Sequence, residues 1–398
     1  MKLFLIVAIC LSNILFGQQT ITSTHNGLAS NPLTWNCYCV PTTYDSVIIN
    51  HTVLIDVNWA VTNGGSITVN PSGELLQAGL KNLVVDGSES VYINHGKSSF
   101  DNVAFTNEGS LINDGHFSIN NTVHVSWFCN IDNSGLIDGI DSLYNKGVFL
   151  NTGTLYLGNL LNDGEFFTIG SLGVDSIGNN AIFTIEGGYV YCNSFGNLGG
   201  FQMLGPCFMD VANDLFNNDI FILGPENQIF VHHDLINGDS LSGPAMIIND
   251  GLIEVWNNFY NVNGLYGSGK FCIANGSYNY GSMYGIYDFC DNTGGSIDVN
   301  NGIVDVEITF CQPGCSVGLT EFGTVNVQVY PNPSAGVFAV NGVADNTEVV
   351  VYSLAGQRVS KTNVLNGTFD LTNLPIGTYL IIFADAFNVK PVKINIQK

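Results

Sequence analysis

The chain has 398 residues, of which 45% are hydrophobic and only 11% charged, and its net charge is -23. This length allows more than one domain. The 25 Phe and 16 Tyr exclude a disordered acidic tail, because such tails lack apolar side chains to bury. The acidity argues against nucleic acid or an anionic membrane surface as a partner, since both would be repelled.

The N-terminus predicts a secretory signal peptide over residues 1–17. Lys2 supplies a short positive segment, Leu3 to Phe16 an apolar segment, and Gly17 a small residue before the cut. The apolar segment is shorter than a membrane span requires. Export would place the mature chain where disulfide bonds form.

The first cysteines of the predicted body, residues 18–323, are Cys37 and Cys39. They resemble half of a metal site, but neither a second cysteine pair nor a histidine cluster completes it. We therefore expect a disulfide or inert thiols here rather than zinc.

A short phrase recurs along the body: Asn, any residue, Gly, any residue, then an aliphatic or aromatic residue. Gly accepts positive φ, and Asn hydrogen-bonds its own backbone in turns, so each copy predicts a corner. The copies begin at Asn107, Asn113, Asn133, Asn145, Asn151, Asn162 and Asn249.

The spacing of these corners indicates the architecture. Neighbouring copies six residues apart, such as Asn107 and Asn113, leave strands too short for stable free hairpins. Short strands are stable when each pairs with its equivalent in the next turn of a coil, and the longer gaps of 17 to 20 residues suit three short sides per coil. We predict an all-β fold with a parallel β-helix or solenoid body. A string of antiparallel sandwiches is the alternative.

The stretch TWNCYCVPTTYDSVIINHTVLID, followed by GSITVNPSGEL, resembles the opening of secreted β-helical surface proteins of Gram-negative bacteria. In those proteins a Trp and a Pro precede the first strands and a Gly-bounded turn. The resemblance implies a surface protein with a β-helical body.

The charges of the body bear on catalysis. Its only basic residues are Lys81, Lys97, Lys146 and Lys270, whereas an enzyme acting on acidic polysaccharides needs cations to hold the uronate groups. Hydrolysis of neutral glycans needs only two suitably spaced carboxylates, which the sequence does not exclude. We predict a structural or adhesive body without a catalytic site. The alternative is a secreted carbohydrate-binding or carbohydrate-active protein, such as a glycoside hydrolase or lyase.

No metal or cofactor is predicted. His232 and His233 are adjacent, so on a strand they would face opposite ways and make poor ligands for one ion. Calcium suits turn carboxylates and carbonyls, yet no calcium-binding loop motif occurs, and calcium is left as a hypothesis.

Asp-Ser followed by an aliphatic residue occurs four times. This pattern resembles the O-glycosylation signal of exported proteins in some Gram-negative bacteria, although Asp-Ser is also ordinary turn chemistry. The four serines are Ser46, Ser142, Ser176 and Ser240.

Two further cysteine pairs stand near the end of the body. Cys311 and Cys315 flank a Pro-Gly turn in CQPGC and are predicted to form a disulfide; Cys272 and Cys290 are a second candidate pair.

The pattern changes over residues 324–398, which carry almost balanced charge. Several alternating strands in this short segment predict a small antiparallel, Ig-like sandwich. Pro331 and Pro333 fix φ and remove amide donors, so the chain must turn there, and we expect Tyr330 and Phe338 to bury their rings on either side of that turn.

Four blocks, VYPNPSAGVF, VVVYSLAGQRV, LPIGTYLI and VKPVKINIQK, closely resemble the type A C-terminal sorting domain of the type IX (Por) secretion system. Ser353 departs from the usual Asp. The residues that carry the resemblance are Tyr330, Pro331, Asn332, Pro333, Gly336, Phe338, Gly356, Gly377, Tyr379, Lys393 and Lys398.

The resemblance implies delivery through the periplasm and across the outer membrane to the cell surface or the medium. The implied partners are the type IX secretion machinery and its sorting protease, with surface lipopolysaccharide as an attachment point. The ligand of the body, a glycan or another surface molecule, is not identified by any motif.

Overall fold

The computed structural model divides into two compact units, with the division between Val317 and Gly318. The predicted boundary after residue 323 and the predicted signal peptide both lie outside the described residues. The residues that the structure describes are 18–239, 245–311, 327–343, 345, 347–353, 358–383 and 392–397.

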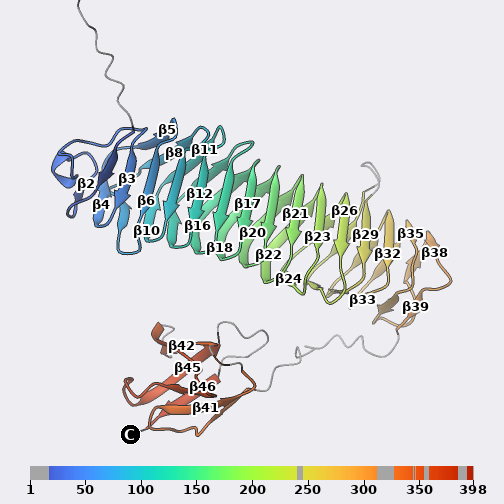
Figure 1. Ribbon diagram of the computed structural model, residues 1–398. Coiled ribbons are helices and arrows are strands. Elements are labelled where there is room, and N and C mark those ends of the chain that lie inside the picture. Colours follow the sequence, from blue (N-terminus) through green and yellow to red (C-terminus); the bar gives the residue numbers. More distant parts are fainter. Residues whose placement is uncertain are drawn as a thin grey trace, which may run out of the picture. The chain divides into compact units, whose positions relative to one another are not determined.

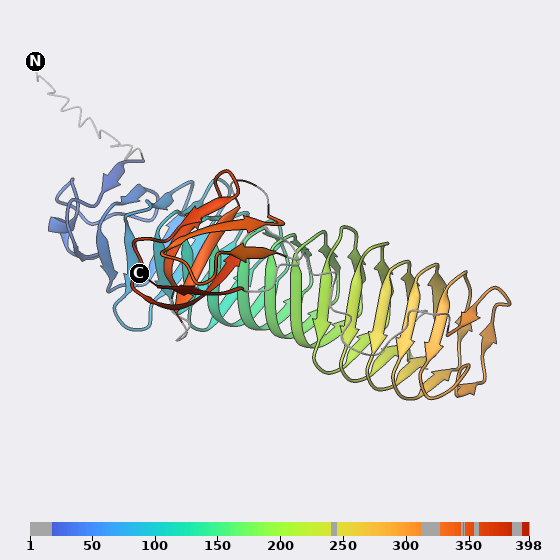
Figure 2. The same ribbon diagram turned by 90° about the horizontal axis from the view of Figure 1, so that it is seen from below.

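The first unit is a parallel β-solenoid (Figures 1 and 2). One side of the coils forms a 15-stranded sheet that runs from β1 (Thr20–Thr22) and β3 (Ser46–Ile49) to β38 (Ile303–Val304). The other two sides join in a 24-stranded sheet, to which β13 (His116–Ile119) and β14 (Thr122–Val125) contribute one coil. Strands of successive coils pair in parallel, which confirms the predicted solenoid and excludes the string of antiparallel sandwiches.

The interior is filled by side chains that repeat from coil to coil. Alternate residues of most strands are buried, as in the pattern of β13, and the buried ones are mainly aliphatic and aromatic. Phe149, Phe166 and Phe183 stack in register, with ring centroids 5.1 and 4.8 Å apart. Equivalent positions of neighbouring coils thus build continuous columns of apolar contacts.

The recurring asparagines lie inside this core. Asn113, Asn133 and Asn151 end their strands and are fully buried. Asn113 donates its side-chain N–H to the amide oxygen of Asn133, and Asn133 donates to that of Asn151, each over 2.7 Å. A second ladder follows another corner, with every step 2.8 Å long. It contains Asn145, Asn162, Asn179, Asn197, Asn217, Asn237, Asn261, Asn279 and Asn300.

The predicted corners are therefore present, and several Asn side chains bond the backbone of their own turn as predicted, as Asn162 does with the carbonyl of Gly164 over 3.1 Å. The prediction missed that the same side chains also satisfy one another across coils.

Coil length varies along the solenoid. Register partners are 20 residues apart at Asn113 and Asn133, but 18 apart at Asn133 and Asn151 and 17 apart at Asn151 and Thr168. In these shorter coils the second and third sides merge into one long strand. The long strands are β16 (Leu136–Asn145), β18 (Thr154–Asn162), β20 (Ser171–Asn179) and β22 (Tyr189–Asn197).

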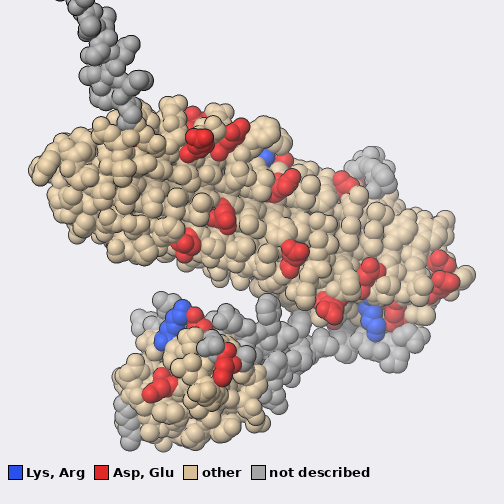
Figure 3. Space-filling view, in the orientation of Figure 1, with Lys and Arg blue, Asp and Glu red and all other residues tan. Residues whose placement is uncertain are grey.

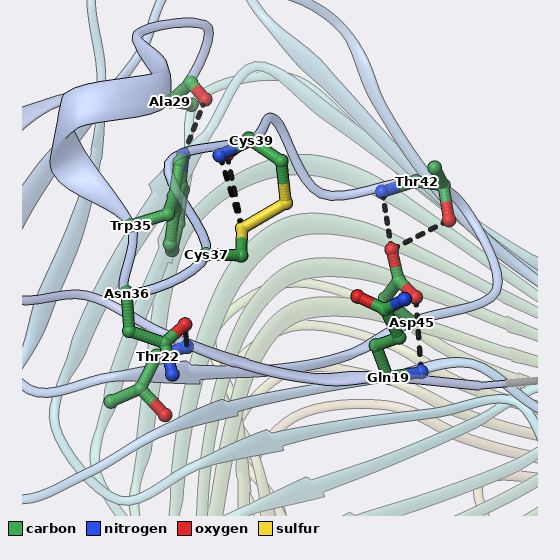
Figure 4. The surroundings of a disulfide bond; sticks show 9 residues. All are labelled: Gln19, Thr22, Ala29, Trp35, Asn36, Cys37, Cys39, Thr42 and Asp45. Carbon is green, nitrogen blue, oxygen red and sulfur yellow. Dashed lines mark hydrogen bonds between the residues drawn. A yellow bond between two sulfur atoms is a disulfide. The ribbon is translucent and has the colours of Figure 1, made fainter.

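A compact cap begins the solenoid (Figure 4). Trp35 is fully buried, donates its indole N–H to the carbonyl of Ala29 over 2.9 Å, and packs edge-on against Trp59. Beside it, Cys37 and Cys39 form a disulfide, which confirms the preference for a disulfide over zinc.

The second unit has two antiparallel sheets. One contains β40 (Gln328–Tyr330), β41 (Val337–Asn341) and β44 (Thr368–Asp370). The other contains β42 (Glu348–Ser353), β43 (Arg358–Asn363), β45 (Gly377–Phe383) and β46 (Val392–Ile396). Phe338 and Phe369 from the first sheet share one core with Val351 and Ile381 from the second, as predicted for a sandwich.

Candidate functional site

Over the part of the chain that the structure describes, no helix has the length and apolar character to cross a membrane. The candidate functional sites are a groove on the solenoid and the sorting motif of the second unit.

The groove lies where the long strands β16, β18, β20 and β22 run side by side. It has a volume of about 670 Å³, within the range of roughly 300–1,000 Å³ found for small-molecule sites. Three tyrosines and two aspartates line it together with small and aliphatic residues; there is no Lys, Arg, His or Cys among the lining residues. Its side chains are thus of two kinds that matter for binding, aromatic rings and carboxylates.

Two tyrosines flank a glycine in the groove. Tyr156, Gly173 and Tyr191 are register partners on β18, β20 and β22, so they form one outward row across three coils. Because strands in a sheet are about 4.8 Å apart, the tyrosine backbones are separated by about 9.6 Å. A Cβ at Gly173 would lie only 2.7 Å from Cδ1 of Tyr156, so the Tyr156 ring occupies the space that the glycine leaves.

The rings are accessible to a ligand. Tyr156 is 53% exposed and Tyr191 is 38% exposed, although both belong to a regular sheet. Tyr189, the third tyrosine, stacks on Phe208 with centroids 5.3 Å apart and donates its hydroxyl to Asp210 over 3.2 Å. Burial, followed by the charge of Asp210, raises the pKa of Tyr189 to about 12, so its hydroxyl stays protonated at neutral pH.

Two carboxylates lie in the next outward row of the same strands, beside the tyrosine row. Asp141 is on β16 and Asp175 on β20, with Gly158 of β18 between them. The side chain of Asp175 accepts a hydrogen bond from Asn193 over 3.2 Å, and Asn193 in turn accepts one from the Tyr191 hydroxyl over 3.0 Å. Within the described structure the Asp141 carboxylate has no hydrogen-bond partner, so it is free to accept one from a ligand.

The same two carboxylates are the only pair in the groove that could act on a glycosidic bond. Their two-strand separation of about 9.6 Å is close to the 6.5–9.5 Å spacing of inverting hydrolases. A general acid of that type, however, is kept protonated by an apolar pocket. Asp141 and Asp175 are both exposed, and nothing of this kind surrounds them.

On the face of the solenoid that Figure 3 shows, carboxylates are spread along its length. Histidines of the solenoid pair with aspartates of neighbouring coils: His95 with Asp114, and His232 with Asp210. The two adjacent histidines lie in a bend after β27 (Gln228–Val231) rather than on a strand, and they have different partners, since His233 binds Asp214 over 2.5 Å.

His233, Asp214 and Asp234 are nevertheless close together, with ligand atoms within 4.8 Å of one another. These atoms already have partners. His233 and Asp214 bind each other, and one Asp234 oxygen accepts from Asn257 and from the backbone and side-chain N–H groups of Asn258. The calcium hypothesis gains no support from this group.

The predicted glycosylation serines lie within strands. Ser46 of β3 accepts hydrogen bonds from Gln18 and Ser66 and is half-buried, as are Ser142 of β16 and Ser176 of β20. Ser240 lies outside the described residues. Glycosylation stays a prediction.

The cysteines near the end of the solenoid differ from the expected pairing. Cys272 is disulfide-bonded, whereas Cys290 and Cys311 are free thiols, so the Cys272–Cys290 pair is wrong. The free thiol of Cys311 likewise differs from the predicted Cys311–Cys315 bond; Cys315 itself lies outside the described residues. Cys272 and Cys290 are register partners on adjacent strands, so the solenoid does bring them close, but Cys290 is a free thiol and Cys272 is bonded to a different cysteine.

In the second unit, the proline-rich turn is attached to the last strand. The Asn332 side chain donates to the carbonyl of Lys393 and accepts from the N–H of Asn395, both over 2.8 Å. Ser334 adds two backbone hydrogen bonds, to Asn395 and Gln397. The first and last blocks of the motif therefore form one structural element.

The aromatic residues and glycines of the motif have distinct roles. Phe338 is fully buried against Phe369, as predicted, but Tyr330 is 51% exposed, so the expectation that both rings are buried is wrong for Tyr330. Gly336 has φ +119°, and a Cβ there would lie 2.7 Å from the Thr372 Cα, so a side chain is excluded.

The remaining motif residues sit at the ends of the second sheet. Gly377 begins β45, and Tyr379 is buried and donates its hydroxyl to Pro375 over 2.9 Å. Lys393 is exposed on β46, while Pro331 and Pro333 are exposed in the turn. Gly356 and Lys398 lie outside the described residues.

Comparison with known families agrees with this assignment. Residues 328–397 match the secretion system C-terminal sorting domain. The chain therefore carries a type IX sorting domain that interacts with the type IX machinery and directs export across the outer membrane, to the cell surface or the medium. No curated protein and no solved structure matches the chain.

Proposed function

We propose that the solenoid is an adhesive, non-catalytic module that the sorting domain carries to the cell surface. The groove of β16, β18, β20 and β22 is the observation that carries the proposal. It presents exposed tyrosine rings on a regular sheet, and its lining has no cation or thiol for chemistry.

The regular sheet favours adhesion. Each coil is held to the next by backbone pairing and by buried amide ladders, so the spacing of outward side chains is set by the strand spacing. Aromatic rings held in this way offer contact area at little cost in side-chain entropy, as they do at many interfaces.

The test compares cells that express the full chain with cells that lack it, for adherence to surfaces coated with matrix from the same culture. We expect adherence to fall when the chain is absent and to return on complementation. Unchanged adherence in the deletion strain would refute the adhesive role.

The secreted carbohydrate-active alternative is tested separately. The purified full chain is incubated with neutral polysaccharides, and reducing ends and unsaturated products are measured. If the wild-type chain releases oligosaccharides and the D141N and D175N variants do not, the proposed role is catalysis rather than adhesion.

The type IX assignment has its own test. A chain that ends at residue 323 is expected to accumulate in the periplasm, because the sorting domain is missing. Normal surface display of that truncated chain would contradict the assignment.

A further inference from the structure

We propose that the groove binds a neutral or amino-substituted oligosaccharide, with one pyranose ring against Tyr156 and another against Tyr191. This inference rests on the adhesive role proposed above and specifies its ligand. Two features of the groove carry it: its row of exposed aromatic rings and the sign of its charges.

The aromatic row suits sugar rings. One face of a pyranose presents C–H groups that pack on an aromatic ring, while its edge presents hydroxyls. Tyr156 and Tyr191 provide two such rings from strands two apart in one row, with backbones about 9.6 Å apart, and Gly173 between them leaves the room into which the Tyr156 ring leans.

The adjacent row supplies acceptors for hydroxyls. Asp141 and Asp175 lie beside the rings, and the Asp141 carboxylate has no partner within the described structure. Carboxylates accept hydrogen bonds from hydroxyl pairs or from an ammonium group, and such charge-assisted bonds are stronger than neutral ones. The Tyr191–Asn193–Asp175 chain of hydrogen bonds orients one ring and one carboxylate together.

The charge excludes the acidic glycans. The groove has two carboxylates and no cation, and the body has only four lysines, so uronate, sulfate or sialate groups would meet like charge without compensation. An apolar peptide strand fits less well, because the groove crosses the middle of a sheet whose backbone groups are already paired and offers no free edge for strand addition.

The experiment is isothermal titration of the purified full chain with three probes: a neutral gluco-oligosaccharide, a chitosan oligosaccharide and an oligogalacturonate. We expect one of the first two to bind and the oligogalacturonate to show no heat of binding. Tighter binding of the oligogalacturonate than of both other probes would overturn the proposal.

Variants locate the site. Y156A and Y191A should each weaken binding about tenfold or more, by analogy with the loss of a stacking ring. Y280A is the matched control, since Tyr280 is 51% exposed on the same solenoid but outside the groove. Equal affinities for Y156A and Y280A would overturn the assignment of the site.

A second variant displaces the Tyr156 ring without removing it. G173A places a methyl group 2.7 Å from the edge of the Tyr156 ring, which must move, and should weaken binding while the thermal midpoint changes little. If neither neutral nor amino probes bind while cells still need the chain to adhere, the ligand class is wrong and the adhesive role stands. If adherence is also independent of the chain, both are wrong.

Discussion

Replacement of one ladder asparagine tests whether buried amides hold the coils together. Asn179 is fully buried, accepts a hydrogen bond from Asn162 and donates to Asn197, each over 2.8 Å. In N179A the Asn197 amide oxygen loses the side-chain donor shown for it, whereas the Asn162 N–H groups keep the carbonyls of Gly164 and Ile182. One orphaned acceptor costs about 1–3 kcal/mol, and the small cavity adds about 1 kcal/mol, for a total of about 2–4 kcal/mol.

The assay is urea unfolding of the full chain, followed by circular dichroism, with the solenoid transition fitted separately from that of the sorting domain. N180A is the control, because Asn180 is the next residue, has the same side chain and makes only an exposed hydrogen bond to Asp163. It should lie within about 0.5 kcal/mol of wild type. N179D should be worse than N179A, since a buried carboxylate cannot donate to Asn197. Equal stabilities of N179A and N180A would refute the reasoning.

Four further predictions concern other parts of the chain. The buried Asn145 amide oxygen has no partner within the described structure and lies opposite Val125 of the preceding coil. V125N would supply a donor to that oxygen and extend the ladder by one coil, so it should lower the free energy of unfolding much less than V123N in the same urea assay. Equal losses for the two variants would contradict this extension of the ladder. The hydrogen bond that the His233 ring donates to Asp214 raises the pKa of His233 above its usual value, so this pair favours the folded state at low pH and the contribution is lost as pH rises through the folded pKa. An NMR titration should show the raised pKa of His233 and its return to the usual value in D214N. Maleimide should label exposed Cys311 in the native chain but Cys207 only after denaturation, because burial raises the Cys207 pKa to about 12. Equal labelling rates of the two cysteines in the native chain would contradict this expectation. N332A should lower export, because it removes the side-chain hydrogen bonds that attach the proline-rich turn to β46. N373A, a substitution at an exposed site, should be exported normally.

The sequence was sufficient for the fold class, because the body carries a periodic signal and the C-terminus a compact set of strand-like blocks. Corners at intervals of 17 to 20 residues predicted coils, and the clustered blocks at the C-terminus predicted a separate sandwich. The role of the asparagines was missed because a single buried Asn is unfavourable, and turn chemistry is the usual explanation for Asn before Gly. Only the stacking of identical residues, one per coil, gives each amide its partner, and that depends on register.

The groove was missed for the same reason. Tyr156 and Tyr191 are 35 residues apart in the sequence, and nothing local connects them. A signal was nevertheless present, since two successive coils of 17 and 18 residues would bring residues 35 apart into one row. The cysteine prediction failed for a different reason, because Cys272 and Cys290 do lie opposite each other on adjacent strands, but the thiol of Cys290 is free.

Strand continuity is what separates the groove from the rest of the solenoid. In the coil with β13 and β14, the second and third sides are separate strands joined by Asn120 and Asn121, whereas β16, β18, β20 and β22 each run through both sides. This change removes few residues: His116 pairs with Leu136 and Val125 with Asn145, so both coils have the same length there, and β18 is one residue shorter than β16. Tyr156, Tyr191, Asp141 and Asp175 all lie on the continuous strands, so pairing from β16 to β22 brings the binding groups into adjacent rows. It follows that insertion of two residues at Gly158, which would interrupt β18 and its pairing with both neighbours, should abolish binding while the ladders on either side continue.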